Sequence, residues 1–338
     1  MSNYSPLAAI LNHPNVINKA EKHMQDVAST RQVLTWILSG KKMWNGSSYE
    51  PTAKKFIKEL DGGSRFEVKL LLVTNPLITT YPKDKTWDLQ LNDLGDRAYY
   101  NIQSMGGPIP ITNYDIDVSA SNATNIQDAI EGFLNQASIS IVNLLGSNLL
   151  AAAGTAGTDD WASMYDMVAT SPIADSIGGI SSAAYPNWRN YYKTLTAITT
   201  KAALLAGITT GLNEATVGMM RPRLAVTDTT TYGLIEAGLQ ANQRYTPDTE
   251  LVEAGFVAMK YDACSIIFDP LATAQTMLLL NPEGLKYGVL KNANMKMRPF
   301  VDTPNGDLIV GFIRHRGNLL MIDRRTQGIL FDIPTSLT

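Results

Sequence analysis

Hydrophobic residues recur at helical spacing in two long stretches of this chain. In residues Val16–Leu38 they fall at mixed intervals of three and four, which is typical of an amphipathic helix. In residues Asn122–Gly154 one stripe runs the whole length, and Ser121 or Asn122 can cap its start. The stripe consists of Ile126, Ile130, Phe133, Ala137, Ile141, Leu144 and Leu145. Roughly thirty residues make a helix about 45 Å long, so we expect a structural spine that ends at Gly154.

Strand-like patterns precede this helix. Residues Arg65–Val73 alternate and then become fully apolar, and β character resumes over residues Arg97–Gln103 and Pro108–Ala120. The polar, proline-bearing stretch between them has no helical period. The pattern predicts a long hairpin over residues 64–118 with a charged tip. Because a hairpin with few core residues of its own is marginal in water, we expect it to pack on another subunit.

A mixed α/β module follows the helix. Residues 155–191 are rich in Gly, Ala and Ser, which indicates loops. Helices are predicted at Tyr192–Leu212 and Thr229–Gln240, a short strand at Pro222–Thr227, and further strands within residues 256–290.

The chain closes with a β meander over residues 295–333. Its turns are predicted at Pro304-Asn305-Gly306 and at Gly317-Asn318, because these dipeptides favour tight turns. The fold class predicted from the whole pattern is α+β.

The composition adds a hint of assembly. Hydrophobic residues make up 45% of the 338 residues and charged residues only 17%, below the usual quarter, as expected if much surface is buried against partners. With 28 basic and 31 acidic residues the net charge is -3, which disfavours a dedicated nucleic-acid binder. No apolar run is long enough to cross a bilayer, so we expect no membrane partner and a cytoplasm-like compartment.

Candidate chemistry is sparse. The single cysteine, Cys264, lies in an apolar strand-like run and is expected to be a buried structural thiol. The three histidines, His13, His23 and His315, lack metal-ligand spacing and are interpreted as surface or strand-face residues. No nucleophile, zinc or nucleotide-binding motif occurs. We therefore predict no catalytic residue, metal or cofactor, and a structural role in place of an enzymatic one.

Four sequence stretches together resemble a known family. They are GGISSAAYPNWRN (178–190), RPRLAVTDTTTYGLIEA (221–237), EAGFVAMKYDACSIIFDP (253–270) and GDLIVGFIRHRGNLLMIDRRTQGILF (306–331). In their order and spacing over residues 64–338 they resemble the major capsid proteins of tailed double-stranded-DNA bacteriophages, the Hong Kong ninety-seven type of fold. His315-Arg316 departs from that pattern, where similar chains carry apolar or aromatic residues.

The resemblance implies a division of the chain. It implies an N-terminal arm (1–63), an extended loop formed by the hairpin (64–118), a peripheral domain with the long helix (119–154 and 289–338) and an α/β axial domain (155–288). Axial domains would meet around the five- and six-fold axes, and the extended loop would reach across a neighbour.

The implied function is self-assembly into an icosahedral capsid that encloses a double-stranded DNA genome. The subunits would form hexamers and pentamers in the host cytoplasm, and the particle would be the virion capsid. Expected partners are portal and scaffolding proteins, with decoration proteins as an optional addition. Because the chain opens at Met1 and no long charged coiled coil precedes the arm, we expect the scaffold to be a separate protein. Enclosed DNA would be held without sequence preference, because only basic pairs such as Lys41-Lys42 and Arg324-Arg325 occur.

Contacts between subunits are expected at two places. Within residues 178–190, Gly178-Gly179 would turn the backbone tightly, and Tyr185, Pro186 and Trp188 would pin the loop to the body. The expected inter-subunit contacts are Leu77, Ile78, Tyr81 and Trp87 as buried tip residues, Lys83, Lys85 and Asp88 at their rim, and Trp188 and Arg189 in the glycine-rich stretch.

Two alternatives remain open at this point. A shell protein of a cellular nanocompartment would share the same fold. A hydrolase with an unrecognised site belongs to another functional class.

Overall fold

The computed structural model describes residues 43–44, 49–50, 57–72, 78, 80, 83, 95–112, 114, 123–155, 160–241, 246–247, 258–303 and 308–338. The predicted helix at Val16–Leu38 and the turn at residues 304–306 lie outside these residues.

Helices and strands are mixed along the chain. The helices are α6 (Ala123–Leu149), α7 (Met164–Met167), α8 (Lys201–Glu214) and α9 (Thr229–Ala241). The strands before α7 are β1 (Met43–Trp44), β2 (Tyr49–Glu50), β3 (Ile57–Leu60), β4 (Arg65–Leu71), β5 (Gly95–Asn101) and β6 (Gln103–Thr112). Those after it are β7 (Ser176–Ile177), β8 (Ile180–Ser181), β9 (Tyr191–Thr194), β10 (Leu224–Thr227), β11 (Thr246–Pro247), β12 (Ala258–Tyr261), β13 (Cys264–Phe268), β14 (Met277–Leu280), β15 (Leu285–Leu290), β16 (Lys296–Asp302), β17 (Leu308–Met321) and β18 (Gly328–Phe331).

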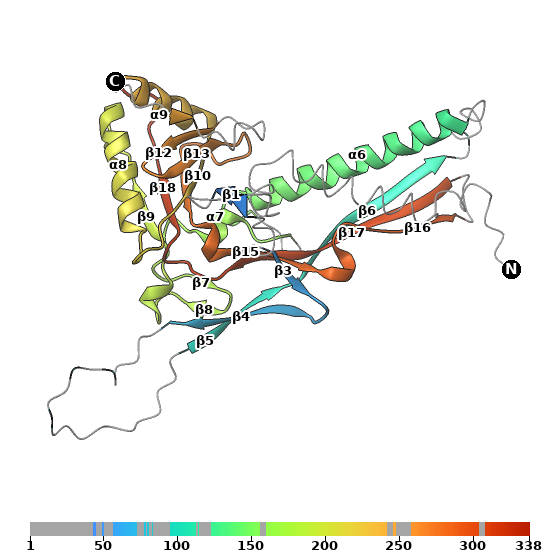
Figure 1. Cartoon of the computed structure of the whole chain (residues 1–338), viewed down its shortest axis with the longest axis horizontal. Coiled ribbons are helices and arrows are strands. Elements are labelled where there is room, and N and C mark those ends of the chain that lie inside the picture. The colour runs from blue at the N-terminus through green and yellow to red at the C-terminus, as the bar shows by residue number, and fades with distance from the viewer. Residues whose placement is uncertain are drawn as a thin grey trace.

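The α/β module is a seven-stranded sheet in the order β11-β12-β13-β10-β14-β18-β9. Helices α8 and α9 lie against one face of it (Figure 1). Side chains of β10 alternate: Ala225 joins the core under these helices, whereas Leu224 and Val226 join the core of the rest of the molecule. A sheet with both faces covered explains why these strands read as continuous apolar runs.

The predicted helix at Tyr192–Leu212 is partly wrong. Residues Tyr191–Thr194 form β9, which pairs in parallel with β18, and α8 begins only at Lys201. The Thr200 side chain caps α8 by accepting a hydrogen bond from the Ala203 N–H at 3.2 Å. Pairing of Tyr191–Thr194 with the distant strand β18 therefore outweighs the helical spacing of hydrophobic residues at the start of the predicted helix.

Helix α6 and three strands form a long arm on one side of the molecule (Figure 1). The 27 residues of α6 confirm the predicted long helix, although it ends at Leu149, before Gly154. Ile141 and Leu145 of the predicted stripe are buried, and Leu144 is 46% exposed. Beneath the helix, β17 pairs with β6 on one side and with β16 and β15 on the other.

The predicted turn at Gly317-Asn318 is wrong. Both residues lie inside β17, which runs unbroken for 14 residues. A Cβ on Gly317 would come within 2.1 Å of the Gly288 carbonyl oxygen and 2.8 Å of the Trp161 ring. The glycine is thus required by close packing between strands, and its conformation is that of a strand.

Candidate functional site

The base of the predicted hairpin packs against its own subunit. Strands β4 and β5 pair in antiparallel register from Arg65↔Asn101 to Leu71↔Gly95. Their inner face is buried against the body and consists of Phe66, Val68, Leu70, Ala98 and Tyr100. The expectation that the hairpin lacks core residues of its own is therefore wrong for its base. The second arm does not stay in the hairpin either, because β6 pairs with β17.

A two-glycine turn holds the hairpin base in place. Gly178 and Gly179 connect β7 to β8 with φ values of 64° and 83°, which confirms the predicted tight turn. The Tyr99 N–H donates to the Gly178 carbonyl oxygen at 2.9 Å. A Cβ on Gly178 would lie 2.8 Å from the Ala98 Cβ, so only glycine permits this approach. We call this contact, together with the bond from Asn187 Nδ2 to the Leu72 carbonyl oxygen at 3.1 Å, the hairpin joint.

A buried arginine, Arg324, forms hydrogen bonds with residues between Met167 and Trp188, the segment that contains the glycine turn of the hairpin joint. Arg324 has no exposed surface. Its guanidinium donates to the carbonyl oxygens of Met167 at 2.8 Å and Trp188 at 3.3 Å, and to Ser182 Oγ at 2.9 Å. It also donates to both carboxylate oxygens of Asp175. We call Arg324 and these partners the arginine clamp, and it ties α7, the segment around β8 and the Pro186–Trp188 turn to the turn between β17 and β18.

The arginine clamp keeps the Asp175 carboxylate ionised. Burial by itself would raise the pKa of Asp175, but hydrogen bonds from Arg324 and Ser182 and the arginine charge outweigh it, so the pKa is lowered. Asp175 is therefore ionised at neutral pH and pairs with Arg324 in a bidentate geometry.

The predicted contact residues of the hairpin tip fall into two groups. Leu77, Tyr81, Lys85, Trp87 and Asp88 lie outside the described residues. Ile78, at 80% exposure, and Lys83 are exposed.

The structure corrects the prediction for Trp188. Trp188 is only 2% exposed and its indole N–H donates to the Ile177 carbonyl oxygen at 3.3 Å, so it is not available to a neighbour. Arg189 is half-buried, and its Nε donates to the Ser182 carbonyl oxygen at 2.8 Å within the same chain. Its contact with a neighbour stays a prediction. The related prediction, that Trp188 pins the loop to the body, is confirmed.

His315 lies in an aromatic cluster inside the arm. It is fully buried, which corrects the surface alternative, and its ring stacks on Trp161 with centroids 5.0 Å apart. The Met295 N–H donates to Nδ1 at 3.3 Å, so Nε2 carries the proton of the neutral ring and lies 2.6 Å from the Tyr287 hydroxyl. Burial lowers the pKa of His315 to about 4 and raises the pKa of Tyr287. The ring is neutral at pH 7 and has a structural role.

Strand pairing also gathers cations that the linear sequence keeps apart. Phe312, Arg314 and Arg316 alternate on the face of β17 that points away from α6, because Ile313 between them lines the groove under the helix. In the neighbouring strand, Lys296 is opposite Arg314 and Arg298 is opposite Phe312. We call Lys296, Arg298, Phe312, Arg314 and Arg316 the arginine face. The only linear signals were the short strings KMR and RHR.

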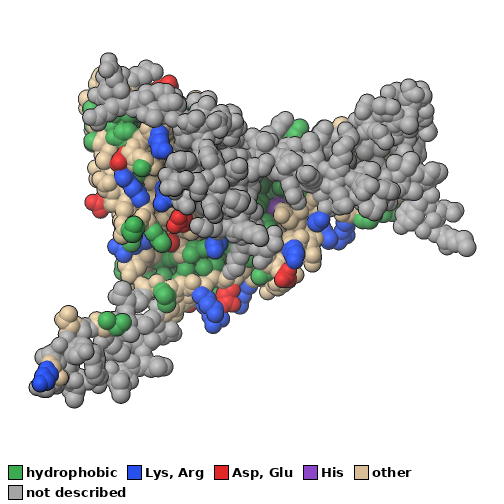
Figure 2. Space-filling view, in the orientation of Figure 1, with side chains coloured by type: hydrophobic (Ala, Val, Ile, Leu, Met, Phe, Trp, Pro, Cys, Tyr) green, Lys and Arg blue, Asp and Glu red, His purple; other side chains and the backbone are tan. Residues whose placement is uncertain are grey.

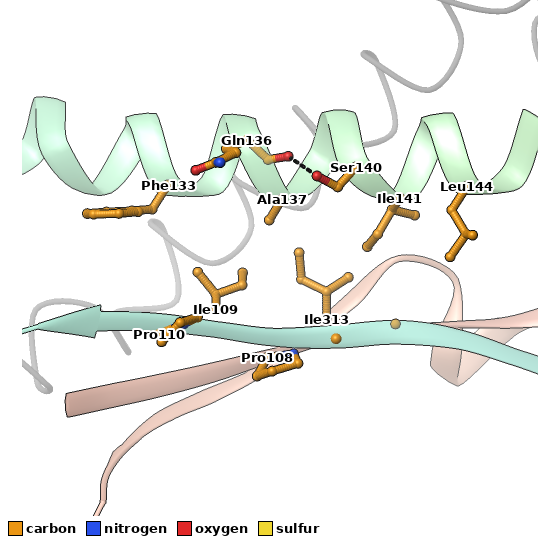
Figure 3. A pocket seen from close by; sticks show the side chains of 12 residues that line it. Pro108, Ile109, Pro110, Phe133, Gln136, Ala137, Ser140, Ile141, Leu144 and Ile313 are labelled. Atoms are coloured by element: carbon orange, nitrogen blue, oxygen red, sulfur yellow. Dashed lines mark hydrogen bonds between the residues drawn. The ribbon is translucent and has the colours of Figure 1, made fainter. Parts of the chain in front are cut away.

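The opposite side of the same sheet forms a groove with α6. Its volume is about 430 Å³, and it is lined mainly by apolar side chains, with Phe133, Ala137 and Ile141 above Ile109 and Ile313 (Figure 3). Gln136 and Ser140 occupy its rim, and the Ser140 hydroxyl donates to the Gln136 carbonyl oxygen at 2.9 Å. This groove carries no catalytic group.

Other candidate chemistry is limited among the described residues. They contain no cluster of three or more His, Cys, Asp or Glu side chains that could hold a metal ion. No helix in the same residues is long and apolar enough to span a membrane. Cys264 is buried, as predicted, and burial raises the pKa of its thiol to about 12, which leaves it protonated and unreactive.

Several solved structures with a similar fold are subunits of capsids or virus-like particles. No protein-family model and no curated protein sequence matches the chain. The capsid asymmetric unit of cyanophage A-1(L) is similar over 82% of this chain and 90% of that chain, with a TM-score of 0.64 and 16% identity. The satellite phage P4 procapsid is similar over 95% and 92%, with a TM-score of 0.53 and 12% identity. A virus-like particle from Pyrococcus furiosus is similar over 93% and 98%, with a TM-score of 0.52 and 10% identity. The chain therefore has the α+β Hong Kong ninety-seven type of fold that its sequence resembles.

Proposed function

We propose that this chain is the major capsid protein of a tailed double-stranded-DNA phage and assembles into an icosahedral shell of hexamers and pentamers. The observation that carries the proposal is the similarity to the cyanophage A-1(L) capsid chain, which covers 82% of this chain and 90% of that chain. The hairpin joint adds a physical reason, because it gives an extended arm a fixed exit from the body.

Assembly in this proposal uses three regions of the chain. Residues 155–288 meet around the symmetry axes, residues 119–154 and 289–338 form the peripheral domain, and residues 64–118 reach across a neighbour. Ile78 is 80% exposed in the single subunit and would lose water on contact with that neighbour. Scaffolding and portal proteins act as separate partners, and assembly takes place in the host cytoplasm.

The first experiment shortens the hairpin without touching its base. Residues 74–94 are replaced by a short Gly-Ser turn, which keeps β4, β5 and the hairpin joint. We expect a folded subunit with an unchanged thermal transition that fails to form stable shells, whereas the wild-type chain forms megadalton particles in mass photometry. Shells of normal size and heat resistance from the shortened chain would contradict an assembly role for the hairpin. A wild-type chain that stays monomeric under all assembly conditions would contradict the capsid function itself.

A nanocompartment shell is the second candidate function, favoured by the similarity to the virus-like particle of Pyrococcus furiosus and to an encapsulin from Synechococcus elongatus. The particle contents distinguish the two. Particles isolated from the native host should protect double-stranded DNA from nuclease if the chain is a phage capsid protein. Particles filled with protein cargo and free of DNA would instead establish the nanocompartment function.

A further inference from the structure

Two strand pairs meet at the junction between the arm and the seven-stranded sheet. In the arm, β15 and β17 pair in antiparallel register as far as Leu285↔Met321, and beyond this point β14 and β18 pair in the seven-stranded sheet. We call residues 281–284 and 322–327, which connect these strands, the sheet junction. The chain changes direction there, because β17 follows the arm whereas β18 runs across that direction (Figure 1). The sheet junction is therefore where the angle between the two sheets is set.

A glutamine side chain replaces the strand pairing inside the sheet junction. Gln327 has no exposed surface. Its Oε1 accepts a hydrogen bond from the Asn281 N–H at 2.8 Å, and its Nε2 donates to the Asn281 carbonyl oxygen at 3.0 Å. The amide thus bonds to both main-chain groups of one residue, as a partner residue in an antiparallel ladder does, and these two partners fix its orientation. Nε2 also donates to the Asp323 carbonyl oxygen at 3.1 Å, which ties the side chain to its own turn.

The opposite strand has a glycine where this side chain approaches. The Gly284 carbonyl oxygen accepts hydrogen bonds from the N–H groups of Ile322 at 2.8 Å and Asp323 at 3.1 Å. A Cβ on Gly284 would lie 2.6 Å from Gln327 Nε2 and 2.7 Å from the Asp323 carbonyl oxygen, so only glycine permits this spacing. The Asn281 side chain adds no second link, because its Nδ2 is buried without a hydrogen-bond partner among the described residues. Gln327 is thus the side-chain amide that connects the two halves of the sheet junction.

The arginine clamp anchors one of these halves. Arg324 lies in the same turn as Gln327, and the Gln327 N–H donates to the Arg324 carbonyl oxygen at 3.0 Å. Arg324 in turn is bonded to Met167 and Asp175. Residues 322–327 are therefore fixed to the body, and the Gln327 amide holds the connection between β14 and β15 against them.

Apolar contacts alone would leave the angle adjustable. Leu278 and Ile329 on one side of the sheet junction and Leu285 and Leu319 on the other belong to one buried cluster. Figure 2 shows further hydrophobic side chains at the surface where the arm joins the seven-stranded sheet. Such contacts are favourable but non-directional, so two sheets can tilt while they stay packed. Hydrogen bonds depend steeply on distance and angle, and those between the halves of the sheet junction include both bonds of the Gln327 amide to Asn281.

We infer that Gln327 is a positioning residue for the shell, whose amide, bonded to the Asn281 main chain, fixes the angle between the arm and the seven-stranded sheet. This inference rests on the proposed shell function, because a reproducible angle matters where many copies must close into one particle. Subunits that lose the amide but keep the fold should have a range of angles and should form particles with a range of sizes.

A distance across the sheet junction tests the angle directly. Nitroxide labels at Lys193→Cys in β9 and Arg298→Cys in β16 are on opposite sides of it, at exposed positions, and the buried Cys264 stays unlabelled. In unassembled full-length subunits, double electron–electron resonance should give one narrow distance distribution. Gln327→Met, which has a side chain of similar length without the amide, should widen the distribution about twofold or more. A broad distribution in the chain that keeps Gln327, or an unchanged width in folded Gln327→Met, overturns the inference.

Asn318→Leu is the matched control. The Asn318 amide is also buried, and its three hydrogen bonds go to Ala162, Leu319 and Asn101. It lies inside β17, outside the sheet junction. Its removal should lower the thermal midpoint and leave the width of the distance distribution unchanged. Equal widening by both substitutions would assign the effect to a general loss of stability and would also overturn the inference.

A second variant changes the sheet junction from the opposite strand. Gly284→Ala keeps the Gln327 amide but places a Cβ against it and against the Asp323 carbonyl oxygen, so the distance distribution should shift. If Gln327→Met does not fold, Gly284→Ala supplies the same test. An unchanged distribution in the folded alanine variant counts against the inference.

Particle size is the second readout. In mass photometry the wild-type chain and Asn318→Leu should each give one narrow particle mass, whereas Gln327→Met should give several masses or open fragments. Uniform particles from Gln327→Met would overturn the role of this residue in assembly and leave the shell function standing. A wild-type chain that forms no particles would instead contradict the shell function, and the distance measurement would still decide whether Gln327 fixes the angle.

Discussion

Arginine has two opposite environments in this subunit. In the arginine clamp, Arg324 is fully buried and directs its donors at oxygens that meet them, including both oxygens of Asp175. On the arginine face, Arg298 and Arg316 are exposed and have no ion-pair partner among the described residues. A guanidinium with all its partners inside the chain stabilises the subunit, whereas one exposed on the sheet contributes little to the stability of the subunit.

The largest expected effect comes from removing the buried guanidinium. Arg324→Gln leaves Asp175 without its counter-charge and the carbonyl oxygens of Met167 and Trp188 without a donor. Breaking a buried pair of this kind costs about 3–5 kcal/mol, measured as a fall in the free energy of unfolding in urea. Arg316→Gln serves as the matched control, because an exposed substitution should change stability by less than about 0.5 kcal/mol. Equal effects of the two variants would show that the comparison is wrong.

His315 should make the stability of the arm depend on pH. Burial lowers its pKa from 6.5 to about 4, so between these values the unfolded chain binds a proton that the folded chain does not. Stability is complete above pH 6.5 and falls as the pH decreases towards 4, by up to about 3 kcal/mol. Denaturant unfolding at a series of pH values measures the slope, and His315→Gln should flatten it in this window. A slope unchanged by the substitution would assign the effect to other groups.

The smallest expected effect is the difference in stability between alanine substitutions at Gly178 and Gly179 in the hairpin joint. Gly178 and Gly179 both have positive φ, so alanine at either position carries a backbone penalty of about 1–2 kcal/mol. Only the new Cβ at Gly178 would also clash, 2.8 Å from the Ala98 Cβ, whereas the Cβ at Gly179 meets nothing within 4 Å. Gly178→Ala should therefore lower the thermal midpoint by several degrees more than Gly179→Ala. Equal shifts would mean that the hairpin base is free to move away.

The sequence was sufficient for features that depend on local patterns. The apolar stripe before Leu149 predicted a long helix, and the two glycines at 178–179 predicted a tight turn, because spacing and backbone freedom are local properties. The sequence misled where a distant strand decided the outcome. Gly317-Asn318 resembles a turn, yet the close approach of Gly288 and Trp161 makes glycine necessary inside a strand.

The contact sites were harder still to predict. Trp188 lies in a loop whose aromatic residues suggested an interface, but its side chain is buried in the core. Its carbonyl oxygen accepts a hydrogen bond from Arg324, which is 136 residues further along the chain. The arginine face could not be found from linear spacing, because it exists only when Lys296 is registered against Arg314. The hairpin tip remains a prediction, since most of its residues lie outside those that the structure describes.

The unbroken course of β17 has a mechanical consequence. At 14 residues it extends for about 46 Å, and it exchanges the flanking strand β16 for β15 without an interruption in its own backbone. A load applied to the far end of the arm, such as internal pressure on a closed shell, is thus carried along one covalent strand into the body. The ladders on both sides would have to be sheared lengthwise, with many hydrogen bonds loaded together, before the arm could detach. The subunit is therefore stiff in tension along β17 and should bend instead at the ends of that strand.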